Sequence, residues 1–185
     1  MDHYLIEHCA PTLASIKTAN LFRVSFDTQK NLFDAVRRWN NTLRDKGVLC
    51  FCLCLHEHTA LIYVVRMSRL QMICLTRLSV SFFPPLAIQA KMQSTLSFVL
   101  RQHLMQSDTF PHEIGIFLGY PLADVKGFII NHGHNCLCCG DWKVYSDPEN
   151  AVKTFRRYCK CKQIYRRMWE QGKRSSPVDS QRISA

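Results

Sequence analysis

Cysteine and histidine side chains are the most prominent chemical feature of this chain, which has 10 Cys and 8 His among 185 residues. Thiolate and imidazole groups bind zinc and iron, and thiols also exchange electrons. Seven of these residues crowd into one stretch near the C-terminus: His132, His134, Cys136, Cys138, Cys139, Cys159 and Cys161. This crowding predicts a Cys/His site for zinc or iron, although its spacing is closer than that of a standard zinc finger. The alternative is buried structural cysteines, since Cys also packs as a small apolar residue.

Three other cysteines predict core packing. Cys50, Cys52 and Cys54 alternate with apolar residues in the run VLCFCLCL. Because side chains alternate along a strand, all three are expected to line one face of a strand that is buried on both sides.

The segment PHEIG places a histidine and an acidic residue at the start of a predicted helix. Glu113 in the first turn complements the helix dipole, which is a structural role. His112 could ligate a metal ion or accept a proton, and a cysteine nucleophile such as Cys138 could use it as a base. His112, Glu113 and Cys138 are therefore the catalytic candidates. The alternative is that His112 only packs against the helix or caps it.

Residues 110–131 also have the spacing of a helix-turn-helix, with Gly119 in the turn between two short helices. Such a unit can dock in the major groove of DNA, and the net charge of +10 would favour binding. The second helix, PLADVKGFI, contains only Lys126 as a donor and lacks the Arg, Asn and Gln residues that read base edges. Nucleic-acid binding is thus an alternative hypothesis.

The last predicted helix is strongly basic. Between residues 143 and 174 there are ten Lys and Arg but only three Asp and Glu. An apolar stripe at helical spacing accounts for packing, and the cations fall largely off it. Such a face attracts acidic partners. The residues expected to dock an acidic redox protein are Lys153, Arg156, Arg157, Lys160, Arg166 and Arg167.

The elements that must position these residues indicate an α+β fold in a single domain over residues 1–172, followed by a polar, flexible tail over residues 173–185. A hairpin is predicted over residues 48–55 and 60–65, with a third strand over residues 141–145. Together these strands form a small antiparallel sheet. Helices cover it, and they are predicted over residues 10–24, 28–43, 68–76, 86–106, 110–118, 121–131 and 147–171.

The N-terminus has no signal peptide, and the most apolar runs are too short or too interrupted to span a bilayer. We therefore expect a cytoplasmic protein without a membrane partner, whose cysteines are mostly reduced. No Walker-type loop, dinucleotide fingerprint, nucleophile elbow or HExxH motif is present in the sequence.

Two motifs separated by the single residue Ile116, PHEIG and FLGYP, carry a resemblance to a bacterial family of uncharacterised proteins, domain of unknown function 3793. The resemblance extends over nearly the whole chain and includes CAPTL, DVKGFI, CCG and WKVY. Asp141 departs from it, because the family usually has Tyr there. It implies a redox or metal context, since genes of the family lie near those for flavodoxins and ferrous-iron uptake. It favours Cys138, Cys139 and Cys161, with Cys9, as metal ligands.

These observations lead to one main hypothesis and two alternatives. The main hypothesis is an accessory factor in metal or redox metabolism, with a Cys/His site and a basic face that docks an acidic partner such as a flavodoxin. The first alternative is a nucleic-acid-binding regulator that uses residues 110–131. The second is an enzyme that depends on Cys and His.

Overall fold

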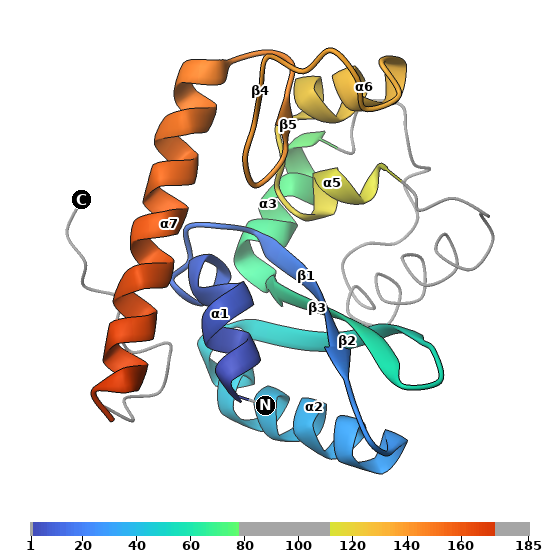
Figure 1. The fold of residues 1–185 in the computed structure, drawn as a ribbon, viewed down its shortest axis with the longest axis vertical. Helices are drawn as coiled ribbons and strands as arrows, with labels where there is room; N and C mark the ends of the chain where they lie inside the picture. The colour runs from blue at the N-terminus through green and yellow to red at the C-terminus, as the bar shows by residue number, and fades with distance from the viewer. Residues whose placement is uncertain (1, 78–111, 173–185) are drawn as a thin grey trace.

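The computed structural model describes residues 2–77 and 112–172 (Figure 1). The helix predicted over residues 86–106 and the tail after residue 172 lie outside these ranges. The elements, in chain order, are α1 (Asp2–Leu13), β1 (Ala19–Ser25), α2 (Gln29–Leu43), the 3-10 turn η1 (Arg44–Lys46), β2 (Val48–Leu55), β3 (Thr59–Arg66), α3 (Met67–Arg77), α5 (Ile114–Phe117), α6 (Leu122–Ile130), β4 (Cys138–Cys139), β5 (Lys143–Val144) and α7 (Pro148–Glu170).

A three-stranded antiparallel sheet in the order β1-β3-β2 lies at the centre and confirms the predicted α+β class. The predicted hairpin is β2 and β3, and they are joined by a short polar turn. The third strand differs from the prediction. It is β1, whereas the segment over residues 141–145 contributes β5 to a separate two-stranded sheet with β4.

The helix predicted over residues 10–24 is wrong. Helix α1 ends at Leu13, and Ser15 adopts a left-handed backbone with φ of 60° that a helix cannot continue through. After this break, β1 pairs with β3 from Ala19 opposite Val65 to Ser25 opposite Thr59. The apolar residues of β1 fit both the helical period and the strand period. Pairing with the distant strand β3 selects the strand.

Helices cover both faces of the sheet. On one face, α1, α2 and α7 bury apolar side chains such as Leu13, Trp39 and Tyr165 against the strands. On the other face, α3 and α5 do the same, with Leu70 and Phe117 in the core. Helix α7 runs along one side of the molecule, from the β4–β5 hairpin to α1 (Figure 1). Among the helices of residues 2–77 and 112–172, none is both long and apolar enough to cross a membrane.

Helix α2 agrees with the predicted bounds and ties down the edge of the sheet. Thr28 caps it by accepting a hydrogen bond from the Asn31 backbone N–H. Further along, the Asn40 side chain donates to the Cys50 carbonyl at 2.9 Å and accepts from the Cys50 N–H at 2.8 Å. Strand β2 lies at the sheet edge, so this amide satisfies backbone groups that would otherwise lack a partner.

The three cysteines of β2 do not share one face, contrary to the prediction. Cys50 and Cys52 pack in the core beneath α1 and α2. A register shift between Cys52 and Cys54 turns Cys54 to the opposite face, where it packs beside α3 and α5. The bulge adds a residue on one strand, which reverses the alternation that the prediction assumed.

A buried arginine fixes the end of the sheet to the segments beside it. The Arg66 guanidinium donates to the carbonyls of Thr12 at 3.1 Å, Leu13 at 2.6 Å and Lys46 at 2.8 Å. These carbonyls belong to the end of α1 and to η1, so one side chain satisfies groups left open at the ends of two helical segments.

Replacing Arg66 by Met should lower the free energy of unfolding by on the order of 3 kcal/mol, because three charge-assisted bonds are lost and their acceptors stay buried. Urea denaturation measures this change. The matched control is Arg69→Met, which removes one bond from an exposed side chain to the Ser15 carbonyl. A loss no larger than that of the control would contradict the role assigned to Arg66.

Candidate functional site

The segments that carry the sequence motifs meet around one cavity of about 400 Å³. Its lining residues come from α5, α6, the β4–β5 hairpin and the segments beside them, and Figure 1 shows where these elements lie in the fold. It is lined by His112, Ile114, Gly115, Leu118, Tyr120, Asp124, Val125, Phe128, Cys139, Gly140, Trp142 and Lys143. The motifs PHEIG, FLGYP, DVKGFI, CCG and WKVY thus contribute to a single site.

Asp124 holds the hairpin against α6. One carboxylate oxygen accepts from the Tyr145 N–H at 2.8 Å, the Ser146 N–H at 2.9 Å and the Ser146 hydroxyl at 2.7 Å. The other accepts from the indole N–H of Trp142 at 2.7 Å. Burial by itself would raise the pKa of this carboxyl, but the hydrogen bonds outweigh burial and hold the pKa below its ordinary value. The carboxylate therefore stays ionised in a nearly inaccessible place.

Close packing around glycines brings these elements together. A Cβ atom at Gly127 would lie 2.5 Å from the Cβ atom of Tyr145, so the backbone of α6 packs directly against the Tyr145 side chain. A Cβ atom at Gly140 would overlap the ring of Phe155 on α7. The Trp142 indole packs edge-on against this ring, with ring centroids 4.5 Å apart. Helix α7 therefore supports the hairpin wall from outside.

His112, Cys139 and Lys143 bring chemically active groups to the cavity lining. The exposed His112 imidazole packs against Phe128, with ring centroids 4.7 Å apart. Cys139 is exposed and lies opposite Lys143 in the hairpin register. The Lys143 ammonium donates to the Gly133 carbonyl at 2.8 Å. An imidazole, a thiol and an ammonium group thus border one apolar cavity.

The other two catalytic candidates, Glu113 and Cys138, do not line the cavity. Glu113 is half-buried and occupies the N-cap position of α5, where its side chain makes no capping hydrogen bond. Cys138 is paired with the buried Val144 and does not line the cavity. His112 therefore shares the cavity with the thiol of Cys139, not with that of Cys138. The sequence analysis predicted Cys139 as a metal ligand.

The four cysteines predicted as metal ligands fall into two groups. Cys9 and Cys161 pack in the core between α1, α7 and the sheet, together with Cys50. Burial raises the pKa of the Cys9 and Cys50 thiols, that of Cys50 to about 12, and it raises the pKa of Cys161 to about 11. Without a bound metal ion these thiols are protonated at neutral pH, so ligation would have to displace their protons.

Cys138 and Cys139 instead occupy β4, on the hairpin. Within residues 2–77 and 112–172, no three His, Cys, Asp or Glu side chains are grouped so that they could hold a metal ion. The zinc or iron centre stays a prediction, without structural support from the part of the chain that is described.

The helix-turn-helix segment contains two helices, but the first, α5, has only four residues. Ile114, Leu118 and Val125 are buried, whereas Phe128 is half-buried. Asp124 in the second helix is 2% exposed and accepts a hydrogen bond from the hairpin, so it does not face solvent. Lys126 is exposed on α6. DNA binding stays a prediction.

A buried ion cluster, which the sequence analysis did not identify, joins the hairpin to the rest of the molecule. The Lys17 ammonium is 5% exposed and lies 3.8 Å from the Asp141 carboxylate, which also pairs with Lys162 at 3.6 Å. The rings of Tyr120 and Tyr158 flank Lys17 at 5.5 and 5.6 Å. Burial lowers the pKa of Lys17, and Asp141 opposes that shift. The only signal in the sequence was the acidic residue at position 141.

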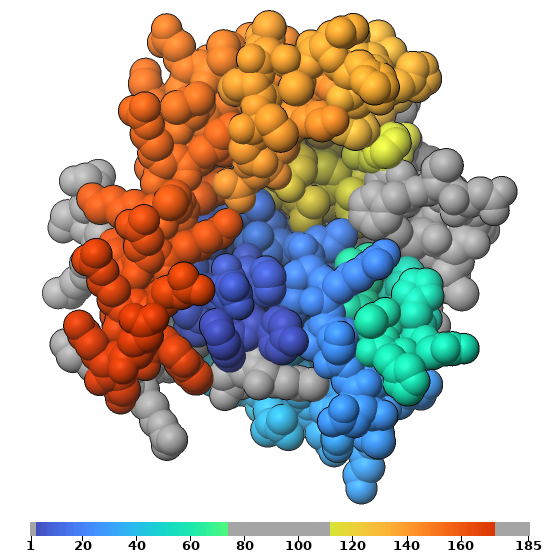
Figure 2. All heavy atoms as spheres, in the orientation of Figure 1, coloured from blue at the N-terminus to red at the C-terminus, as the bar shows by residue number. Residues whose placement is uncertain are grey.

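The predicted docking residues of α7 are all exposed. Lys153, Arg156, Arg157, Lys160 and Arg167 recur at intervals of three, four or seven residues, which places them along one face of the helix. We call these five residues the basic stripe. Arg166 lies off the stripe and pairs with Glu7 of α1 at 3.9 Å. Figure 2 shows α7 along one side of the molecular surface.

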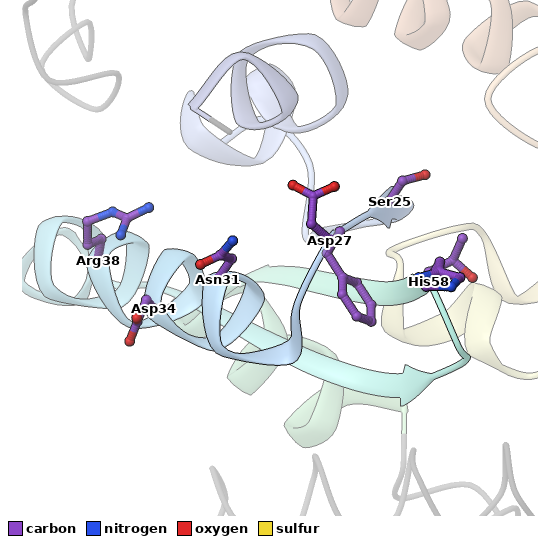
Figure 3. Close-up of a pocket in the computed structure, with 8 residues that line it drawn as sticks. Ser25, Asp27, Asn31, Asp34, Arg38 and His58 are labelled. Atoms are coloured by element: carbon purple, nitrogen blue, oxygen red, sulfur yellow. The ribbon is translucent and has the colours of Figure 1, made fainter.

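A larger, open hollow of about 750 Å³ lies elsewhere, between α2, the end of β1 and the β2–β3 turn (Figure 3). Its labelled side chains come from three separate elements and do not converge on one point. It contains no cysteine and none of the motif residues. The smaller cavity is therefore the better candidate site, because it combines an apolar lining with chemically active groups.

Replacing Asp124 by Asn should lower the free energy of unfolding by about 2 kcal/mol at neutral pH, because an amide cannot accept from donors at both of its ends. Because the folded-state pKa of Asp124 is depressed, its contribution is present above the unfolded pKa and is lost as the pH falls through the folded value.

The difference between wild type and variant should thus shrink below about pH 4, as measured by urea denaturation over a pH series. Asp147→Asn is the matched control, since Asn caps α7 as well as Asp does. Equal losses for the two variants would contradict the role assigned to Asp124.

Replacing Gly127 by Ala should destabilise the protein by on the order of 2 kcal/mol, although the same change normally favours a helix by about 1 kcal/mol. The added methyl group would meet the Tyr145 Cβ atom, and neither backbone can move alone. Thermal unfolding checks the sign. Lys126→Ala on the exposed side of α6 is the control and should be nearly neutral.

Comparison with known proteins supports the resemblance that the motifs carry. Residues 5–178 match the family described as protein of unknown function (DUF3793). Neither a curated protein nor a solved structure matches the chain significantly. The family match covers nearly the whole sequence, including every segment that forms the cavity. The chain therefore belongs to the DUF3793 family.

Proposed function

We propose that this protein is an accessory factor in metal or redox metabolism, which uses the cavity between α5, α6 and the β4–β5 hairpin and docks an acidic partner on the basic stripe. The observation that carries the proposal is the placement of His112 and Cys139 around one cavity built from the family motifs. An imidazole and an accessible thiol beside an apolar cavity suit soft ligands and thiol exchange.

The basic stripe supports the docking part of the proposal. Its five cations are exposed, and the acidic side chains of the last helix lie at its two ends, at Glu149 and Glu170. A single-sign surface of this kind speeds and orients the association of an oppositely charged protein. An acidic redox protein such as a flavodoxin has the matching charge, and the gene context implied by the family resemblance points to the same class.

The cavity and the basic stripe are linked through helix α7. Phe155 of α7 packs on Gly140 and Trp142, both of which line the cavity, while Arg156 and Arg157 follow it directly on the outer side of the same helix. A partner bound to the stripe would therefore be separated by α7 from the hairpin that carries Cys139. This arrangement suits a protein that hands a ligand or electrons to its partner.

The same cavity supports a Cys/His-dependent enzyme as a second candidate, with Cys139 in place of Cys138 as the thiol. That function differs from the accessory role in requiring chemical change of a bound molecule, with His112 as base. We favour the accessory role because the basic stripe is an additional feature that an isolated enzyme would not need.

Reversing three charges of the stripe, Lys153→Glu, Arg157→Glu and Lys160→Glu, should weaken binding to a purified flavodoxin by on the order of tenfold or more. Wild-type binding should weaken as salt is raised. Titration calorimetry at two ionic strengths measures both effects.

The matched control reverses three exposed cations beside α2, with Lys30→Glu, Arg37→Glu and Arg44→Glu. It changes the net charge equally but leaves the stripe intact. Equal weakening by both triple variants, or no binding by the wild type, would contradict the proposed docking face.

A further inference from the structure

Cys136 and Cys139 are separated by two residues, in the order Cys-Leu-Cys-Cys. This is the spacing at which two thiols form a redox-active pair in Cys-X-X-Cys motifs. Cys136 is half-buried and Cys139 is exposed, in contrast to the core thiols of Cys9, Cys50 and Cys161. The pair is therefore accessible to small molecules.

The backbone between the two thiols is not a straight strand. Asn135 adopts a left-handed conformation with φ of 57°, and the chain bends at Leu137 before β4 begins. A bend shortens the distance that an extended segment would impose between Cys136 and Cys139. Cys138 directly precedes Cys139 in β4, and side chains alternate along a strand. Cys138 pairs with the buried Val144. Cys138 and Cys139 therefore point to opposite sides of β4, so only one of them can face Cys136.

Tyr145 follows β5 and lies two residues after Lys143, which is the register partner of Cys139. The Tyr145 hydroxyl is buried and has no hydrogen-bond partner in the described part of the chain. Burial raises the pKa of this hydroxyl, and the thiols of Cys136 and Cys139 raise it further, so both cysteines lie near it. A protonated hydroxyl that lacks an acceptor can donate to a thiolate, which is the form of cysteine that reacts.

We propose that Cys136 and Cys139 are a dithiol site that reacts with small-molecule disulfides, with Tyr145 as a positioning residue that donates to the thiolate. The Cys139 thiolate attacks one sulfur of the disulfide, breaks its S–S bond and releases the first thiol. The Cys136 thiolate then attacks the Cys139 sulfur and releases the second thiol. The protein loses two electrons and two protons, and the disulfide is reduced to two thiols.

This inference deepens the proposed function, because Cys139 belongs to the cavity, and it names disulfides as the substrate class. It is independent of the basic stripe. Failure of the dithiol reaction with intact flavodoxin binding would overturn the inference alone, whereas loss of flavodoxin binding with an intact dithiol reaction would overturn only the docking proposal.

The test treats the reduced full-length protein with oxidised glutathione, alkylates the remaining thiols and maps the cysteines by mass spectrometry. The expected product is a Cys136–Cys139 cross-link without retained glutathione. Cys136→Ser should accumulate glutathione on Cys139, because the resolving thiol is missing. Cys138→Ser is the matched control and should cross-link like the wild type. Glutathione retained on wild-type Cys139, a cross-link through Cys138, or no reaction would each overturn the proposal.

Tyr145→Phe tests the positioning role, and the fold should tolerate it because the hydroxyl makes no hydrogen bond that folding depends on. The pH profile of the first, glutathione-adding step should move to higher pH, since the thiolate loses a donor. The rate at high pH should stay within about twofold of the wild type, where the thiolate forms without help. A profile that does not move would overturn the assignment of Tyr145.

Discussion

A single buried carboxylate holds the candidate site in shape. Asp124 lies on α6, and its hydrogen bonds reach Trp142, Tyr145 and Ser146 on the hairpin. The hairpin has only two residues in each strand and cannot hold its own conformation. Its position, and with it the position of Cys139 and Lys143, depends on an acceptor that stays ionised. A neutral side chain of the same shape would leave at least one donor facing another donor.

A second polar cluster, the ion pairs of Asp141, links the hairpin to the segment before β1 and to α7. Lys17 comes from the α1–β1 loop, Asp141 from the hairpin turn and Lys162 from α7. Three segments that are far apart in sequence meet at one carboxylate. The rings of Tyr120 and Tyr158 flank the ammonium, which is 5% exposed, so the ion pair is weakly screened. The site is therefore built around two acidic residues: Asp124 accepts from donors of the hairpin segment, and Asp141 pairs with cations from two separate elements.

Sequence patterns predicted the elements that local residues determine. Helix α2 with its Thr28 cap, the β2–β3 hairpin and α7 with Pro148 in its first turn all follow from nearby side chains. Strand β1 was missed because its partner lies about forty residues away. The bulge that turns Cys54 was missed because a regular alternation of residue types carries no sign of an extra residue. The motifs identified the cavity-lining segments but not their convergence, which depends on Asp124 and on the close packing of Gly127 against the Tyr145 side chain.

The length of α5 has a consequence for how the molecule folds. A four-residue helix is too short to persist by itself, so its order comes from its surroundings. The Tyr63 hydroxyl in the central strand donates to the Phe117 carbonyl at 2.9 Å, and α5 packs on that face of the sheet. The cavity can therefore exist only while the sheet is formed. Ile114, Phe117 and Leu118 also cover that face of the sheet, so opening the site would expose core side chains of both.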